Sequence, residues 1–415
     1  MRAEIGPERP MDWEREQWMT MRNCKTILVV VQTLTYGQRF GDILPLFDSD
    51  TRLQLFFTVA PHAAFGEGAL RFLRRLGAPV IPWEQAVARE FDLALAAGWE
   101  HIEQVRAPIV LFSHGAGQIK LQRVWHGRPG QERPPGMLSR DNLTRDGRVV
   151  PAAVALAHHG DLATLARNCP EGVPVATVVG DPVYDRLTAS VPRRAAYRDA
   201  LGLRGEQKLV VVSSTWGQGA SFTALDELLP RLLGELPRRR YRVAVLSHPN
   251  IWAGHGWWQV QAWLAGYRRR GVALVPPEAD WRAYLAAADW VLGDHGSLTS
   301  YATVTPAPIL LARYPHDRVH HASPAAALAR LAPALTTARP LEAQLRYAAQ
   351  EYRREEYEAV ASRLTSEPGR FNQRVRALVY GLLGIGCPAY PVPPEPVRSP
   401  SPLARWTADA RGEAA

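Results

Sequence analysis

The sequence is short of lysine, although it is rich in arginine. Lys25, Lys120 and Lys208 are the only lysines among 49 basic residues, so arginine supplies nearly all of the net charge of +9. The arginines are scattered and do not form a basic stripe interleaved with aromatic residues, which argues against a nucleic-acid-binding protein. This charge remains compatible with an acidic ligand or with peripheral contact to an anionic membrane.

Cysteine and long apolar runs are also scarce. Cys24, Cys169 and Cys387 are odd in number and lack metal-ligand spacing, so we predict neither a disulfide framework nor a zinc site. The pairs His158-His159 and His320-His321 have no companion ligands at useful spacing, and we therefore expect no metal. No apolar run approaches the length of a membrane span. We expect a cytoplasmic protein, either free or peripheral to the inner face of the membrane.

Three familiar site motifs are missing. No Gly-x-Gly-x-x-Gly pattern follows the first apolar run, which argues against a dehydrogenase. The glycine and hydroxyl run 213–221 lacks the Gly-Lys-Ser ending of a nucleotide triphosphatase loop, although it could still bind an anion. A serine nucleophile elbow is absent as well.

Short apolar runs alternate with helical patterns through most of the chain. Runs that are apolar on both faces and alternate with helices are typical of parallel sheets in α/β domains. The strands expected in the first half are 26–31, 53–59, 79–81, 93–96, 109–112, 154–156 and 175–179. Those expected in the second half are 209–213, 243–247, 272–275, 290–292 and 309–312.

These patterns divide the chain into five parts. An amino-terminal extension (1–22) precedes a Rossmann-like domain (23–187), which we expect to bind an acceptor, and a second Rossmann-like domain (188–340), which we expect to bind a nucleotide donor. Helices in 341–386 are predicted to cross back and pack on the first domain. The Pro-rich end, 387–415, is predicted to be a disordered tail.

Polar side chains follow several of the predicted strands. In open parallel sheets, ligands bind outside the carboxyl ends of the strands. His114-Gly115 and Lys120 follow one strand, 213–221 follows another, and His248-Pro249 follows a third. A histidine at such a position could act as a general base, since its ordinary pKa is near 6.5. The alternative is a histidine that only bonds a neighbouring carbonyl.

The segment 286–301 reads as a strand that ends in a turn and opens a helix. Gly293 and Gly296 let the backbone approach a ligand, and Ser297 and Thr299 lie where a helix amino terminus leaves N–H groups unpaired. A diphosphate would fit there, whereas the alternative is that Ser297 merely caps the helix. Pro276 and Pro277 are expected to line the base site through their carbonyl groups.

Taken together, these elements resemble the CDP-glycerol glycerophosphotransferase family and, more distantly, UDP-N-acetylglucosamine 2-epimerase and other enzymes of the GT-B architecture. The resemblance covers roughly residues 26–383 and is stronger in the second half. It is carried by His114-Gly115 with Lys120, Thr215-Trp216, His248-Pro249, Asp294 with Ser297, and Gly180 with Pro182 and Asp185.

The resemblance implies two facing Rossmann-like domains and a metal-independent transfer from a nucleotide-diphosphate co-substrate to a hydroxyl acceptor, in cell-envelope or secondary-metabolite biosynthesis. His114 would be the base, and His248 with Ser297 and Thr299 would hold the diphosphate. The full donor-side set is Ser214, Thr215, Gly217, Pro276, Asp294, His295, Gly296, Ser297 and Thr299, and the acceptor-side candidates are Gly37, Gly115 and Lys120.

The chain also departs from the family pattern. Gly217 stands where the family has arginine, Ser247 where it has lysine, and His295 where it has tyrosine. Arg313 or Lys120 could supply the missing positive charge, and Tyr301 lies where nucleotide-sugar enzymes tend to have a glutamate. The alternatives to a transferase are an epimerase-like enzyme and a non-catalytic protein that senses a ligand or supports an assembly. Donor base, transferred group, acceptor and oligomeric state are left open.

Overall fold

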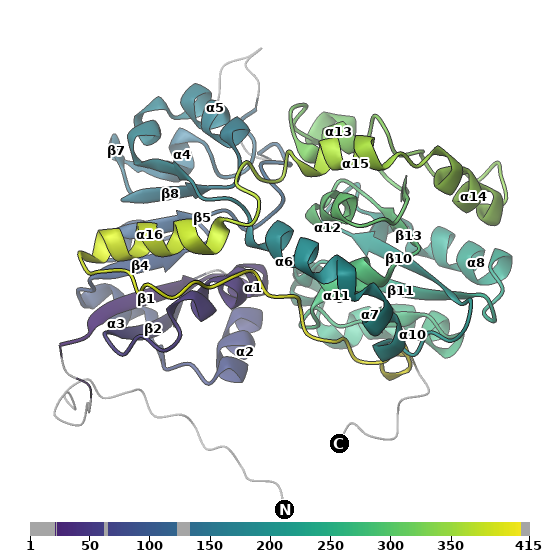
Figure 1. Cartoon of the computed structure of the whole chain (residues 1–415), viewed down its shortest axis with the longest axis horizontal. Helices are drawn as coiled ribbons and strands as arrows, with labels where there is room; N and C mark the ends of the chain where they lie inside the picture. The colour runs from purple at the N-terminus through teal and green to yellow at the C-terminus, as the bar shows by residue number, and fades with distance from the viewer. Residues whose placement is uncertain (1–20, 22, 62–64, 123–132, 408–415) are drawn as a thin grey trace, which may run out of the picture.

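The chain folds into two α/β lobes that lie side by side (Figure 1). This structure is a computed structural model and describes residues 21, 23–61, 65–122 and 133–407. The first sheet has seven parallel strands in the order β3-β2-β1-β4-β5-β8-β9. Their bounds confirm the predicted positions: β1 Lys25–Val31, β2 Leu53–Val59, β3 Val80–Ile81, β4 Leu93–Ala96, β5 Ile109–Phe112, β8 Ala153–Leu156 and β9 Ala176–Val178.

Strand β1 lies inside this sheet, between β2 and β4, and its apolar residues are buried on both faces. Ile27, Val29 and Val31 pack on one layer of helices, and Leu28 and Val30 pack on the other. The first layer holds α1 (Leu34–Ile43), α2 (Gly66–Leu76) and α16 (Phe371–Leu383). The second holds α3 (Trp83–Ala88), α4 (Arg140–Leu143) and α5 (His159–Asn168). A two-stranded ribbon, β6 (Thr144–Arg145) with β7 (Arg148–Val149), follows α4.

The second sheet has five parallel strands in the order β12-β11-β10-β13-β14, again at the predicted positions. They are β10 Lys208–Ser214, β11 Tyr241–Ser247, β12 Ala273–Val275, β13 Trp290–Gly293 and β14 Ile309–Leu311. One face is covered by α6 (Pro182–Ser190), α7 (Arg194–Ala200), α11 (Trp281–Ala287), α12 (Ser297–Tyr301), α13 (Pro324–Leu328) and α15 (Arg354–Ala361). The other is covered by α8 (Leu225–Glu235), α9 (Pro249–His255), α10 (Trp257–Arg269) and α14 (Leu341–Glu351).

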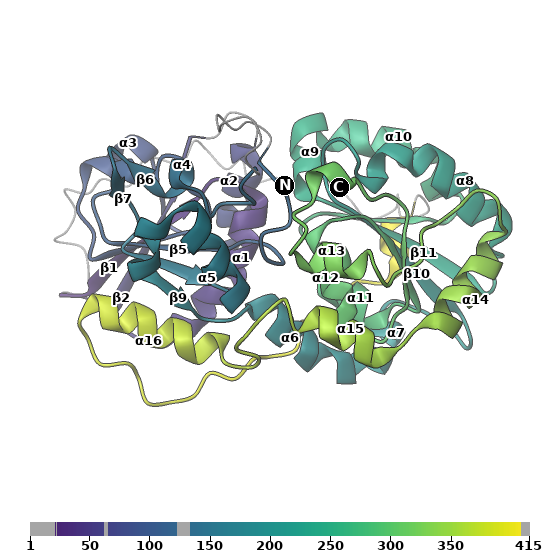
Figure 2. The ribbon, with the colours of Figure 1, turned by 90° about the horizontal axis from the view of Figure 1, so that it is seen from above.

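The carboxyl-terminal helices do not all return to the first lobe. Leu345 of α14 and Val360 of α15 belong to the cores of the second lobe. Only α16 crosses back, where Phe371 and Val375 pack under the first sheet (Figure 2). The prediction for 341–386 is therefore right for its last helix and wrong for the first two, whose apolar faces are buried by the nearer lobe.

The Pro-rich segment that follows α16 is not disordered over residues 387–407. It runs from the first lobe to the second (Figure 1), where Val397 and Leu403 are buried in the core. Tyr197 donates its hydroxyl hydrogen to the Val397 carbonyl at 2.7 Å, and Trp406 donates to the Tyr284 hydroxyl at 2.8 Å. Proline favours an extended backbone and does not prevent its apolar neighbours from packing. Residues 408–415 lie outside the described part of the chain.

Two further sequence expectations concern the ends and the membrane. Apart from Met21, the extension 1–22 lies outside the described residues. Within the described ranges, no helix combines the length and the apolar character that crossing a bilayer requires.

The packing of this strap, residues 387–407, makes a stability prediction. Leu403→Ala should lower the free energy of unfolding by about 2–5 kcal/mol, because it leaves a cavity in the second lobe. The exposed neighbour Ser399 provides the control, and Ser399→Ala should change stability little. Urea unfolding followed by circular dichroism measures both. Equal stability of the two variants would show that the strap does not contribute to the core.

Candidate functional site: a cleft between the two sheets

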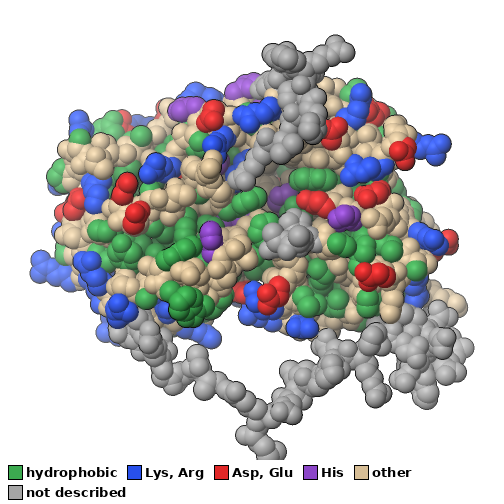
Figure 3. Space-filling view, turned by 180° about the vertical axis from the view of Figure 1, so that it is seen from behind, with side chains coloured by type: hydrophobic (Ala, Val, Ile, Leu, Met, Phe, Trp, Pro, Cys, Tyr) green, Lys and Arg blue, Asp and Glu red, His purple; other side chains and the backbone are tan. Residues whose placement is uncertain are grey.

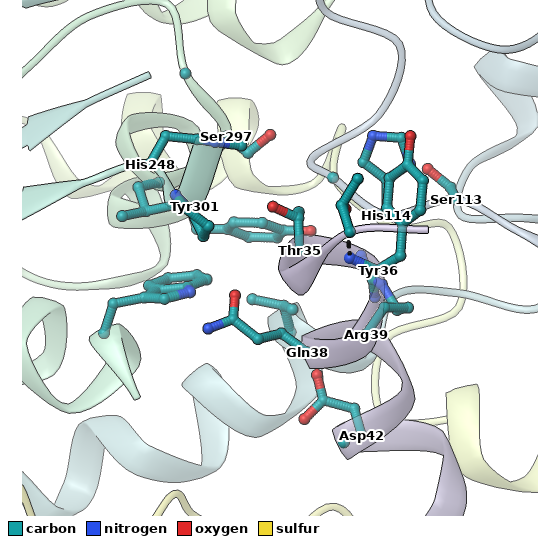
Figure 4. Close-up of a pocket in the computed structure, with 18 of the residues that line it drawn as sticks. Thr35, Tyr36, Gln38, Arg39, Asp42, Ser113, His114, His248, Ser297 and Tyr301 are labelled. Atoms are coloured by element: carbon teal, nitrogen blue, oxygen red, sulfur yellow. Dashed lines mark hydrogen bonds between the residues drawn. The ribbon is translucent and has the colours of Figure 1, made fainter. Parts of the chain in front are cut away.

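The carboxyl ends of both sheets open into one cleft of about 1150 Å³. Strand order reverses between β1 and β4 and between β10 and β13, and open parallel sheets bind ligands at such reversals. Figure 4 shows Thr35, Tyr36 and His114 of the first lobe facing His248, Ser297 and Tyr301 of the second. The cleft is therefore built from both domains, as the sequence predicts.

His114 follows β5 on the first wall of the cleft. Its Nδ1 lies 3.0 Å from the Ala97 carbonyl oxygen, so Nδ1 carries the hydrogen and Nε2 is left as an acceptor. The Tyr36 ring packs against the imidazole at 4.5 Å between centroids. Burial, together with the smaller effects of the Arg39 and Lys120 charges, lowers the pKa of His114 to about 4. The ring is neutral at pH 7 and can accept a proton.

His248 follows β11 on the opposite wall and has the other tautomer. The Asn250 N–H donates to its Nδ1 at 3.0 Å, so the hydrogen of the neutral ring resides on Nε2. Burial lowers the pKa of His248 well below its ordinary value, and Lys120 and His114 lower it further. The neutral ring can thus donate a hydrogen bond from Nε2.

Lys120 reaches from the first lobe to the loop after β10. Its Nζ donates to the Thr215 hydroxyl at 2.9 Å and to the Trp216 carbonyl at 3.2 Å, and it lies 5.1 Å from the centre of the Trp216 ring. This ammonium group therefore stands beside Gly217, where the family pattern has arginine. Arg313 is half-exposed near Glu227 and does not line the cleft.

Asp294 occupies the turn that was predicted to bind a diphosphate. Its buried carboxylate accepts from the N–H groups of Thr215 at 3.0 Å, Ser221 at 2.7 Å and Gly296 at 2.9 Å. Burial raises its pKa, and these hydrogen bonds oppose the rise. The chain thus satisfies part of this N–H cluster with its own carboxyl group, which does not line the cleft, and donor contact by Asp294 stays a prediction that this geometry does not favour.

Thr299 is also turned away from the cleft. Its side chain is fully buried, and its hydroxyl accepts from the Asp294 N–H at 3.2 Å. It packs against Gly293, where a Cβ atom would collide with it. The prediction that Thr299 binds the diphosphate is wrong, since its hydroxyl stabilises the turn.

Ser297 lies in the cleft but links the two lobes. Its hydroxyl oxygen accepts from the Ala116 N–H at 3.2 Å, and a Cβ on Gly115 would stand 2.8 Å from that oxygen. The two walls of the cleft approach each other closely here, which explains why position 115 is a glycine. The helix that Ser297 begins, α12, has only five residues.

The remaining predicted residues divide into those that line the cleft and those that do not. A Cβ atom added to Gly37 would lie 2.7 Å from the Phe72 ring, so this glycine packs closely on that ring. Gly217 has a φ of 87° and shapes the loop after β10. Pro276 lines the cleft, but its carbonyl accepts from Ala279 N–H, and that of Pro277 accepts from Gln38 Nε2. The predicted residues that line the cleft are His114, Gly115, Lys120, Ser214, Thr215, His248, Pro276, His295, Gly296 and Ser297.

His295 stands out within that group. Its side chain is 3% exposed, and its Nδ1 has no hydrogen-bond partner in the described part of the chain. Burial, together with the smaller effects of Lys120 and Arg318, lowers its pKa to about 4. The neutral imidazole is thus a buried polar group beside the cleft.

A buried network of charges joins the two lobes at the floor of the cleft and is absent from the predicted site. Arg39 lies 3.4 Å from Asp181, which also accepts from the Tyr301 hydroxyl at 2.8 Å. Arg282 reaches Asp42 at 2.7 Å. The only sequence signal is the placement of Arg39 and Asp42 in an otherwise apolar helix, because their partners are more than 100 residues away. Tyr301 stands at the position where nucleotide-sugar enzymes tend to have a glutamate. Its hydroxyl instead takes part in this network between the lobes.

Removing the charge of Lys120 should raise the pKa of His295. Lys120→Met takes away a cation that opposes protonation of the ring, whereas Lys208→Met, at the far end of β10, should leave the ring unchanged. NMR titration of the imidazole signals measures both. An unaltered His295 in Lys120→Met would mean that the ammonium group does not act in the cleft.

The comparisons with known proteins agree on the fold. No protein-family model matches the chain, and the search of curated proteins found no match. The wall teichoic acid polymerase TagF is 13% identical, with a TM-score of 0.60 over 87% of this chain and 89% of that one. MnaA of S. aureus, in complex with UDP, is 12% identical, with a TM-score of 0.52 over 86% and 97%. The chain thus has the two-domain GT-B-like fold that the sequence predicts.

Proposed function

We propose that this chain is a transferase that moves a glycosyl or polyol-phosphate group from a nucleotide-diphosphate donor to a hydroxyl acceptor. The observation that carries the proposal is the pairing of two neutral histidines of opposite tautomer across one cleft. His114 offers an unprotonated Nε2, and His248 offers an Nε2–H donor. Such a pair can accept a proton from one substrate and stabilise negative charge on the other.

The donor side of the proposal rests on the second lobe and Lys120. The ammonium group of Lys120 and the Nε2–H of His248 would stabilise the charge that develops on the departing nucleotide. Ser214, Thr215 and His295 line the same wall and supply further polar contacts. Structures of TagF soaked with CDPG and of MnaA with UDP have a similar fold, which supports a nucleotide-activated donor.

The acceptor side rests on the first lobe. The acceptor hydroxyl would transfer its proton to His114 Nε2 while its oxygen bonds to the transferred group, and the bond from that group to the nucleotide would break. The electron pair of that bond leaves with the nucleotide. Ala97 fixes the tautomer of His114, and Tyr36 fixes the orientation of its ring.

Nucleotide binding provides the first test. CDP, UDP, GDP and ADP derivatives should raise the melting temperature to different extents, since a ligand that binds only the folded chain stabilises it. His248→Ala should weaken the best ligand roughly 10- to 100-fold in calorimetry, the effect of losing about 1.5–3 kcal/mol of hydrogen bonding to a charged group. His159→Ala, at an exposed histidine that does not line the cleft, is the control. If no nucleotide stabilises the chain, the donor assignment fails.

The rate of the catalysed reaction tests the role of His114 as the general base. His114→Ala should lower kcat by about 10²–10⁴-fold and leave donor affinity nearly unchanged, because the base acts on the acceptor. In the unchanged enzyme the base is lost only as pH falls through about 4, so kcat/KM should hold its plateau well below the ordinary histidine value of 6.5. A wild-type rate in His114→Ala, or loss of kcat/KM near pH 6.5, would remove His114 from this role.

A further inference from the structure

Three tryptophans stand exposed on one short helix of the second lobe. Trp257, Trp258 and Trp263 of α10 are 40%, 76% and 48% exposed. Four of the chain's 13 tryptophans fall within residues 252–263. Large exposed apolar patches on soluble proteins mark interaction surfaces. We call Trp257, Trp258 and Trp263 the tryptophan face.

The inner side of α10 explains why these rings point outward. Val260 and Leu264 are buried against the second sheet, so the helix is anchored by its other side. Trp257 packs on the buried Trp252 at 4.5 Å between ring centroids. The ring centroid of Trp263 lies 5.0 Å from that of His255 and 6.3 Å from that of Phe222. Trp257 and Trp263 are therefore held in place by neighbouring rings, and the face needs no folding to become available.

The segment that carries this face has charge of one sign. Residues 249–270 contain no Asp or Glu and end in Arg268, Arg269 and Arg270, of which the last two are exposed. Figure 3 shows hydrophobic side chains gathered low on the half of the molecule that carries α10, with Lys and Arg at the margin. Tryptophan favours the bilayer interface, and arginine favours anionic headgroups.

We propose that the tryptophan face and Arg269-Arg270 dock this protein on an anionic phospholipid surface. Successive residues of an α-helix are spaced by about 100° around its axis, so Trp258 and Arg269 project from the same outer side of α10, and Trp257 and Trp263 lie toward its two flanks. Helix α9, which precedes α10, begins at Pro249 on the cleft wall and contacts α1 and α2 of the first lobe. Docking by α10 therefore places the mouth of the cleft beside the membrane. This inference does not depend on the proposed reaction.

Vesicle binding by the full chain tests the proposal. We expect the protein to sediment with vesicles of phosphatidylcholine and phosphatidylglycerol, and less with phosphatidylcholine alone. Trp258→Ser with Trp263→Ser should weaken binding roughly tenfold or more, through loss of buried apolar area. Arg269→Gln with Arg270→Gln should reduce the preference for phosphatidylglycerol and its dependence on salt. Tyr347→Ser, 48% exposed on α14, is the matched control and should bind like the wild type.

Three results would overturn the proposal. The first is a wild-type chain that does not bind anionic vesicles, and the second is unchanged binding by the double tryptophan variant. The third is a dimer in light scattering that this variant converts to a monomer, which would assign the face to a second copy. The single variant Trp258→Glu, at the most exposed ring, repeats the test if the double variant has a lowered melting temperature. Quenching of tryptophan fluorescence by brominated lipid reports contact directly and should fall in both variants.

Discussion

The ion pair between Arg39 and Asp181 sets the relation between the two lobes. Both side chains are almost fully buried, and a buried charge without a partner costs several kcal/mol. Arg39 belongs to α1 at the end of β1, whereas Asp181 caps α6, the helix that enters the second lobe. Tyr301 adds its hydroxyl from α12 of the second lobe. The pair therefore holds the carboxyl ends of the two sheets against one another, and the cleft exists because of that arrangement.

A second constraint lies in the turn after β13. Asp294 fills the backbone N–H cluster that an external phosphate would otherwise occupy, so this turn is stabilised without a ligand. Positive charge for a bound anion must then come from a side chain. Lys120 meets that need across the cleft, and it does so from the first lobe. In the proposed reaction the first lobe would therefore contribute Lys120 to the donor side as well as the base.

The strands and their polar ends could be predicted because each is a local property of the sequence. Val210 and Val212 face one layer and Leu209 and Val211 the other, so the run is apolar throughout and can be recognised without its neighbours. The ion pair of Arg39 with Asp181 could not be predicted from the sequence, because the two residues are 142 positions apart. The strap was wrongly predicted to be disordered, because a proline-rich composition does not show that Val397 packs into the core of the second lobe. The side chain of Thr299 was predicted to face the cleft but is buried, because sequence spacing alone does not show which side of a short helix faces the cleft.

The pKa values of the histidines in the cleft have two causes, and a bound anion would offset the smaller one. Burial is the main cause of their lowered pKa values, and the positive charge of Lys120 is a further cause at His114, His248 and His295. A diphosphate beside Lys120 would cancel that charge and favour the protonated rings. Donor binding should then raise the basicity of His114, so that the base becomes stronger when the donor is in place. Coupling of this kind would link proton transfer to donor occupancy without any movement of the chain.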